Sequence, residues 1–115
     1  MTTQTSRRYT LRLTAELEEL IETHRAELWT ELTVRIQHAD GLTPAYVIRD
    51  LVARGVLKVM RGGATLAPIT GATTRTTALH IPRGQFEQAL TEIAQAYELS
   101  IHATLRALIV AGASS

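Results

Sequence analysis

Apolar and polar residues alternate along two short stretches of the chain. In residues 9–13, tyrosine and leucine alternate with threonine and arginine, and residues 77–81 alternate in a similar way between small or polar and aliphatic side chains. A period of two residues places every second side chain on the same face of a β-strand. Both stretches are therefore predicted to be strands with one buried face.

A second pattern occurs twice, from Leu42 to Gly55 and again from Leu99 to Gly112. Each copy begins with Leu followed by Thr or Ser. After four further residues come an aliphatic residue and Arg, then any one residue, two aliphatic residues, any two residues and finally Gly. The hydroxyls of Thr43 and Ser100 can cap the first free amide groups of a helix. We expect two short amphipathic helices, each ended by its glycine in the left-handed conformation.

A helical pattern also follows each predicted strand. The helix of the second copy is expected from Arg83 onward, directly behind Pro82. The first copy holds eleven additional residues here, about three turns at roughly 3.6 residues per turn. Residues at a helical spacing continue across this insert: Leu17, Leu20, Ile21, His24, Leu28, Leu32 and Ile36. One long helix from about Ala15 to His38 is therefore predicted, with Trp29 in the core or an interface.

Residues 61–74 separate the two copies and are rich in Gly, Thr, Ala and Pro, without a helical or strand period. They are predicted to be a linker between a first unit, residues 7–60, and a second unit, residues 75–113. Residues 56–60 fit either a helix end or an extended stretch. With 115 residues, the chain has room for one domain or for two small units that share a core. The predicted fold class is mainly α with a two-stranded antiparallel ribbon.

This order of strand, helix, turn and capped helix, ending in aliphatic-Arg-x-aliphatic, resembles the ribbon-helix-helix family, which includes DNA-binding repressors of the Arc and MetJ type. The resemblance covers Arg7 to Gly55 and Arg75 to Gly112, and the insert departs from the family's spacing. A single copy cannot pair its strand or bury both helices, so two copies form the family's binding unit. The resemblance thus implies a tandem pseudo-dimer within one monomeric chain, which can still self-associate on DNA.

In this family the ribbon enters the major groove of double-stranded DNA, where each base pair presents a distinct pattern of donors and acceptors. Strand alternation assigns the base-reading residues: Arg8, Thr10, Arg12, Thr76, Ala78 and His80. Arginine can make two hydrogen bonds to guanine, whereas Ala78 can only contact a methyl group and His80 is usually neutral at pH 7. We expect the first strand to dominate sequence choice. Alternatively, the arginines only keep a solvated strand edge soluble.

The start of each second helix offers free amide groups and the positive end of the helix dipole to a DNA phosphate. The residues expected against phosphates are Arg7, Thr43, Ala45, Ser100 and His102. Thr43 and Ser100 would be caps in any protein, and the two roles are compatible. Arg49 and Arg106 lie inside the helices and are expected to pair with nearby acids or phosphates rather than to read bases.

Charge is distributed unevenly along the chain, although the net charge is only +1. Residues 14–40 hold seven acids and two arginines, a net charge of −5, so the remainder carries +6. Phosphates would repel the acidic helix, so the insert is expected to project away from DNA. Its acidic surface is a possible binding site for a protein partner.

Several classes of function lack their characteristic residues. The chain has no cysteine, which excludes disulfides and thiolate chemistry. Its four histidines do not follow a metal-ligand spacing, and neither a Gly-rich phosphate loop nor a nucleophile elbow occurs. We therefore expect no metal, no cofactor and no enzymatic activity. The longest apolar stretch is far too short for a membrane span, so a cytoplasmic protein without a membrane partner is expected.

The leading hypothesis is sequence-specific binding of double-stranded DNA by a transcriptional repressor or a plasmid or phage maintenance factor. Two alternatives stay open. One is an accessory DNA-binding protein of a conjugative relaxosome, and the other is a protein-interaction module that uses the long acidic helix. Salt dependence separates DNA binding from protein interaction, because each phosphate contact releases counterions.

Overall fold

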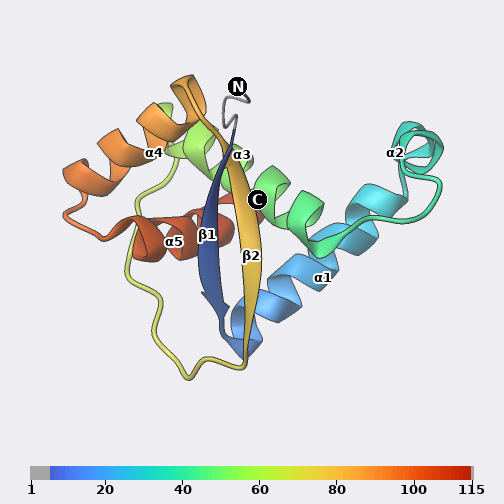
Figure 1. The fold of residues 1–115 in the computed structure, drawn as a ribbon, viewed down its shortest axis with the longest axis horizontal. Coiled ribbons are helices and arrows are strands. Elements are labelled where there is room, and N and C mark those ends of the chain that lie inside the picture. The colour runs from blue at the N-terminus through green and yellow to red at the C-terminus, as the bar shows by residue number, and fades with distance from the viewer. Residues whose placement is uncertain (1–5, 115) are drawn as a thin grey trace, which may run out of the picture.

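The computed structural model describes residues 6–114, in which two strands and five helices form a mainly helical fold (Figure 1). The elements are β1 (Ser6–Leu13), α1 (Ala15–Trp29), α2 (Leu32–Gln37), α3 (Pro44–Met60), β2 (Arg75–Pro82), α4 (Gln85–Ala96) and α5 (Ile101–Ala113). The predicted fold class, mainly α with a two-stranded antiparallel ribbon, is confirmed at this level. Residues 1–5 and 115 lie outside the described part of the chain.

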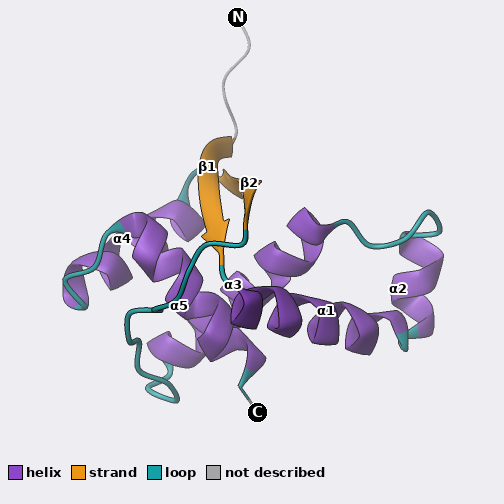
Figure 2. Ribbon diagram, turned by 90° about the horizontal axis from the view of Figure 1, so that it is seen from below, coloured by secondary structure: helices purple, strands orange, loops and turns teal. Residues whose placement is uncertain are grey.

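Strands β1 and β2 pair antiparallel with each other and form a ribbon on one side of the helices (Figure 2). The period-two pattern of the sequence determines its two faces. Tyr9, Leu11 and Leu13 of β1 and Leu79 and Ile81 of β2 are buried against the helices. The alternating residues of β1 point to solvent, so the predicted division into a buried and an exposed face is correct.

Helices α3 and α5 pack closely on each other and contact the buried face of the ribbon. The repeated glycines lie at this crossing. A Cβ atom on Gly55 would stand 2.3 Å from the carbonyl oxygen of Leu108, and one on Gly112 would stand 2.0 Å from that of Leu51. Only a residue without a side chain allows the two helix backbones to approach so closely.

The predicted role of these glycines as helix ends is therefore wrong. Gly55 lies inside α3, which continues to Met60, and Gly112 lies inside α5. Neither has a positive φ. Residues 56–60 are helical because Val56 adds a buried contact and the residues that follow carry no helix breaker. The helix-starting caps are correct: Thr43 and Ser100 are N-caps whose hydroxyls accept backbone N–H bonds.

The predicted long first helix is interrupted after Trp29. The hydroxyl of Thr30 donates to the carbonyl of Glu27 at 2.7 Å, and Glu31 is extended, with φ −83° and ψ 125°. A threonine that bonds to a carbonyl of the preceding turn competes with helix continuation. A separate helix, α2, then forms with Val34 as its buried residue.

The continuous apolar face expected across the insert is also wrong beyond the break. Leu32 and Ile36 are 64% and 69% exposed, although Leu28 before them is buried. Trp29 is half-buried at the junction. The insert thus ends in a short arm, α2, that extends from the body of the molecule (Figure 1).

The connection between the copies contains neither helix nor strand in residues 61–74, as predicted. Its end is fixed to the first copy: the amide of Thr74 donates to the carbonyl of Leu13 at 2.8 Å, and Arg75 pairs with Glu18 at 3.2 Å. The predicted helix start behind Pro82 is wrong, because Pro82 ends β2 and α4 begins at Gln85.

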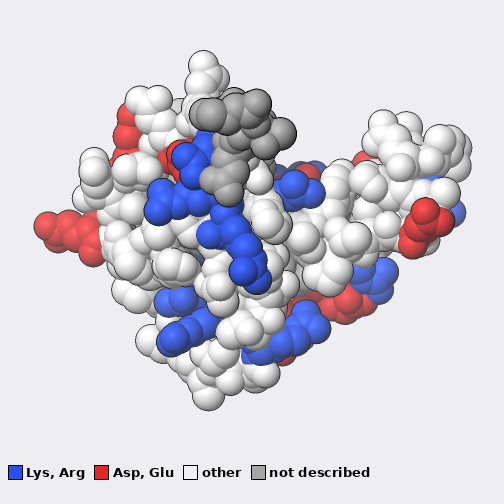
Figure 3. Space-filling model, in the orientation of Figure 1, with Lys and Arg blue, Asp and Glu red and all other residues white. Residues whose placement is uncertain are grey.

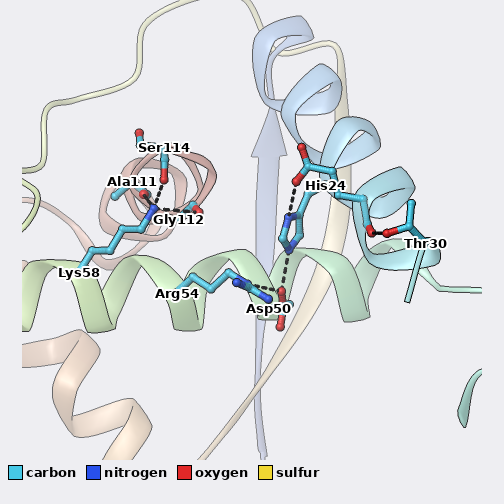
Figure 4. A network of polar contacts seen from close by, with 9 residues as sticks. His24, Thr30, Asp50, Arg54, Lys58, Ala111, Gly112 and Ser114 are labelled. Carbon is cyan, nitrogen blue, oxygen red and sulfur yellow. Dashed lines mark hydrogen bonds and ion pairs between the residues drawn. The ribbon is translucent and has the colours of Figure 1, made fainter. Parts of the chain in front are cut away.

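A polar network joins α1 to α3 (Figure 4). Nε2 of the buried His24 lies 2.6 Å from Oδ2 of Asp50, and Nε of Arg54 donates to the same oxygen at 2.7 Å. Burial alone would raise the pKa of Asp50, but the hydrogen bonds from His24 and Arg54 and their charges lower it below its ordinary value. The ionised carboxylate therefore holds the two helices together.

Lys58 of α3 closes the end of α5. Its ammonium donates to the carbonyl oxygens of Ala111 at 3.1 Å and Gly112 at 3.4 Å, and also to that of Ser114. The last carbonyls of a helix lack partners within the helix, and a cation there also opposes the negative end of the dipole. Lys58 thus fixes the position of α5 against α3 (Figure 4).

Candidate nucleic-acid interface

The candidate interface is the face of the ribbon that points away from the helices. Five of the six predicted base-reading residues are exposed there: Arg8, Thr10, Arg12, Thr76 and His80. Ala78 is half-buried, because its short side chain lies between longer neighbours. The antiparallel register places Arg8 opposite His80, Thr10 opposite Ala78 and Arg12 opposite Thr76. The fold therefore brings all six residues into one two-stranded surface.

Positive side chains gather over this surface. Figure 3 shows Lys and Arg along the ribbon and beside it, whereas Asp and Glu lie mainly toward the edges of this view. The sequence explains the separation: residues 51–86 contain five Lys or Arg and no Asp or Glu, and this stretch includes all of β2. A surface with one sign of charge attracts a polyanion over several ångströms.

A shallow cleft of about 410 Å³ runs between β1 and α5, lined by Thr10, Arg12, His102 and Arg106. His102 lies edge-on to the ring of Tyr9, with 5.8 Å between ring centroids and 78° between the planes. This contact ties the first turn of α5 to the ribbon. The cleft thus combines two guanidinium groups, an imidazole and a hydroxyl, all of which can donate hydrogen bonds to an anion when the imidazole N–H faces it.

The starts of α3 and α5 have matching geometry. The Thr43 hydroxyl accepts from the amide of Tyr46 at 3.2 Å, and the Ser100 hydroxyl accepts from the amide of Ala103 at 3.1 Å. Both capping residues are exposed, and Ala45 beside the first cap is half-buried. The remaining amide groups of each first turn are the donors that helix starts offer to anions.

Arg7 was expected at a phosphate and is exposed at the beginning of β1. Its guanidinium carbon lies 5.6 Å from the centroid of the Tyr9 ring, a distance at which a cation is attracted to an aromatic face. The ring holds the guanidinium beside the ribbon. Arg7 thus lies on the Tyr9 side of β1, beside Thr91 and Gln95 of α4, and not among the alternating residues of the outer ribbon face.

The two helix arginines behave differently from each other. Arg49 is exposed on α3, whereas Arg106 is half-buried and lines the cleft beside Arg12. Sequence reasoning assigned Arg106 only a local pairing role and missed its place at the ribbon. The signal was present, because Arg49 and Arg106 occupy the same position of the repeat, but a helix position alone does not show which strand residue it will meet.

Other kinds of site find little support in the described residues. Within residues 6–114, no group of three or more His, Cys, Asp or Glu side chains could hold a metal ion. No helix in this part of the chain is long and apolar enough to cross a membrane. Comparison with known protein families, with curated proteins and with solved structures found no match to the chain.

Proposed function

We propose that this protein binds double-stranded DNA by inserting its β1–β2 ribbon into the major groove. The observation that carries the proposal is the outer face of the ribbon, where Arg8, Thr10 and Arg12 lie in register with His80, Ala78 and Thr76. A two-stranded ribbon fits the width of the groove, and arginine is the side chain best suited to guanine.

We further propose that the chain is a tandem pseudo-dimer of ribbon-helix-helix units, and the strand register supports it. The repeat relates Thr10 to Ala78, and these two residues are direct partners. The repeat also relates Arg12 to His80, but the strand partner of Arg12 is Thr76. Thr76 and His80 lie at equal distances along β2 on either side of Ala78. Antiparallel pairing of two copies always exchanges partners in this way about a local two-fold axis. The specific support is that this axis passes between Thr10 and Ala78, near the middle of both paired strands.

The helices give independent support for the same axis. Gly55 approaches the backbone of Leu108, and the equivalent Gly112 approaches the backbone of Leu51, the equivalent of Leu108. Reciprocal contact of this form, in which residue i meets j and j meets i, characterises a two-fold interface. In ordinary members of the family the partner is a second chain, whereas here the linker of residues 61–74 supplies it covalently.

The expected binding mode divides the contacts into two kinds. Arg8 and Arg12 of the ribbon would read bases, while the starts of α3 and α5, with Arg7 and the cleft residue Arg106, would hold phosphates on either side. Phosphate contacts fix the position of the protein on the duplex without selecting sequence. Selectivity would therefore depend on few side chains.

The test measures the affinity for labelled duplex DNA by fluorescence anisotropy, at salt concentrations from about 50 to about 200 mM. A DNA-binding ribbon predicts that log affinity falls linearly with log salt, with a slope of about −0.9 for each phosphate contacted. Duplexes selected from a random pool would supply the specific site. Arg8→Ala/Arg12→Ala should abolish preference for the selected site.

Arg35→Ala is the matched control, because Arg35 is an exposed arginine on α2, away from the ribbon. It removes one positive charge, as Arg12→Ala does, and should leave affinity within about twofold because it makes no contact with phosphate. Equal losses for Arg12→Ala and Arg35→Ala would mean that only net charge attracts DNA. An affinity independent of salt would overturn the proposal as a whole.

Within the DNA-binding class, we propose a sequence-specific repressor or a plasmid or phage maintenance factor, and an accessory role in a conjugative relaxosome stays the alternative. A protein-interaction module is the second candidate function. The observation that favours it is the solvent exposure of Leu32 and Ile36 on the arm. Contiguous exposed apolar surface is a common mark of a protein-interaction site.

A further inference from the structure

Four large apolar side chains are exposed in the described part of the chain, and they form two pairs. Leu32 and Ile36, four residues apart on α2, form what we call the arm patch; Leu57 and Met60, three residues apart on α3, form the α3 patch. Residues three or four apart lie on the same side of a helix. Each pair is therefore a small continuous apolar surface rather than two isolated side chains.

The two patches lie at opposite ends of α3. The loop of residues 38–43 joins the arm to the start of α3 at Pro44, whereas Leu57 and Met60 lie in its last turn (Figure 1). A helix of 17 residues is about 25 Å long at 1.5 Å per residue. The arm patch of one molecule consequently cannot cover its own α3 patch.

The charges around the two patches have opposite signs. Glu27, Glu31 and Asp40 are exposed around the arm, where Arg35 is the cation on α2. Arg54 of α3 also interacts electrostatically with Glu27 and Glu31, but its guanidinium is bonded to Asp50. The exposed Arg61 follows the α3 patch directly, and Lys58 beside it directs its ammonium to the carbonyls at the end of α5; no acid occurs between residues 51 and 86. Two arm patches facing each other would bring acids together, and two α3 patches would bring cations together. Only the unlike pair combines apolar contact with attraction.

We infer that the arm patch of one molecule docks on the α3 patch of a second copy, so that the chains associate head to tail. The contact is heterologous, because it joins two different surfaces, and repetition extends it into an open row of molecules. It uses neither the ribbon nor the cleft beside α5. The inference therefore does not depend on the proposed DNA binding.

The contact is small and its affinity correspondingly low. Four apolar side chains with a rim of charges cover much less than the roughly 1,200–2,000 Å² of a stable interface. Association should therefore appear at concentrations of about 0.1 mM and above, in the range of millimolar to micromolar dissociation constants. Added salt should weaken it, since the charged rim contributes attraction that ions screen.

The first experiment is sedimentation velocity of the full chain from about 10 µM to 1 mM, at low and high salt. The expected result is a mass that increases continuously with concentration from the 12.6 kDa of one chain, and that decreases again in high salt. An arm variant, Leu32→Ser/Ile36→Ser, and an α3 variant, Leu57→Ser/Met60→Ser, should each stay monomeric. Gln85→Ser/Gln95→Ser, two exposed positions on α4, is the matched control and should associate like the natural sequence.

Mixing the two variants gives the decisive measurement. The arm variant keeps an intact α3 patch, and the α3 variant keeps an intact arm, so an equimolar mixture can form one contact and no more. We expect a 1:1 pair that stops at twice the mass of one chain. Circular dichroism should show unchanged melting temperatures, because all four side chains point to solvent. Arg61→Glu, which leaves the apolar residues intact, should weaken association at least tenfold.

Three results would overturn the inference. The weakest dissociation constant that we expect for so small a contact is about 1 mM. If the natural chain is still monomeric at that concentration, a second copy does not cover the patches. If the α3 variant alone still forms dimers, the contact is arm to arm. If the mixed sample forms no pair, but both variants lose binding to a different protein that the natural chain binds, the patches serve that protein and not a second copy.

Discussion

Thr10 of β1 and Ala78 of β2 are direct partners in the ribbon, and their neighbours on the exposed face differ in kind. Two arginines flank Thr10, whereas Thr76 and His80 flank Ala78. The two strands thus offer unequal chemistry at equivalent places. One carries permanent charges with several donors, and the other carries a hydroxyl, a methyl group and an imidazole.

This inequality predicts unequal effects of matched substitutions. Arg12→Ala should relax specificity and weaken binding together, because a good bidentate base contact is worth roughly 1–3 kcal/mol of discrimination. His80→Ala should change either quantity little. The measurement is competition of each variant between specific and scrambled duplexes at fixed salt. Equal losses of specificity would show that β2 reads bases as an equal partner.

A symmetric ribbon should select a symmetric site. The triple variant Thr76→Arg/Ala78→Thr/His80→Arg gives β2 the groove-facing residues of β1 in the order that a two-fold axis requires. Selection from random duplexes should then yield a palindrome, since equal half-ribbons prefer equal half-sites. The unaltered chain, selected in parallel, should yield a site without that symmetry. A non-palindromic result for the triple variant would argue against a two-fold axis through Thr10 and Ala78.

Gly55→Ala should destabilise the fold even though alanine normally favours a helix. The added Cβ would lie 2.3 Å from the Leu108 carbonyl oxygen, so α3 and α5 must separate, and overpacking of this kind costs about 1–3 kcal/mol. Gly63→Ala is the control, because its Cβ would meet its nearest neighbour at an ordinary 3.5 Å. Thermal or urea unfolding gives both values. A stabilised Gly55→Ala variant would mean that the helix crossing is looser than described.

Asp50→Ala should lower the free energy of unfolding by about 1–3 kcal/mol, since it leaves Nε2 of the buried His24 ring without its partner. Glu22→Ala, which removes an exposed pair with Arg25, should change the free energy of unfolding little. Urea titration at pH 7 compares the two variants. Similar small effects would show that the network does not hold α1 on α3.

The same carboxylate gives a pH dependence with a definite sign. The pKa of Asp50 is lower in the folded protein than its ordinary value of 3.8, because the hydrogen bonds from His24 and Arg54 outweigh burial. Its contribution is therefore complete above pH 3.8 and is lost as the pH falls through the lower, folded value. The stability difference between the natural chain and Asp50→Asn should shrink in that acid range. A difference that grows on acidification would contradict the assignment.

Short-range patterns in the sequence predicted the ribbon and the starts of α3 and α5 well. Strand alternation depends on neighbouring residues only, so Tyr9, Leu11 and Leu13 were assigned to the buried face without knowledge of what they pack against. Capping is equally local, and Thr43 and Ser100 are caps as expected.

The errors arose where distant contacts decide the outcome. A glycine after a helical period fits a helix end, yet Gly55 and Gly112 meet a second helix whose position the sequence does not show. Leu32 and Ile36 continue a helical spacing, but α1 ends at Trp29, and both side chains stay exposed because the arm does not pack them on the rest of the described chain. Arg106 was missed at the interface for the same reason, since its place depends on how α5 crosses β1.

The linker of residues 61–74 has a consequence for how the protein can change over generations. In a dimer of identical chains, one altered codon appears in both strands of the ribbon, so the two halves must vary together. Here β1 and β2 are encoded separately within one chain, so a single mutation alters only one strand and leaves the other as it was. If the ribbon reads DNA as proposed, each strand can therefore acquire a new base preference by single substitutions while the contacts of the other strand stay unchanged.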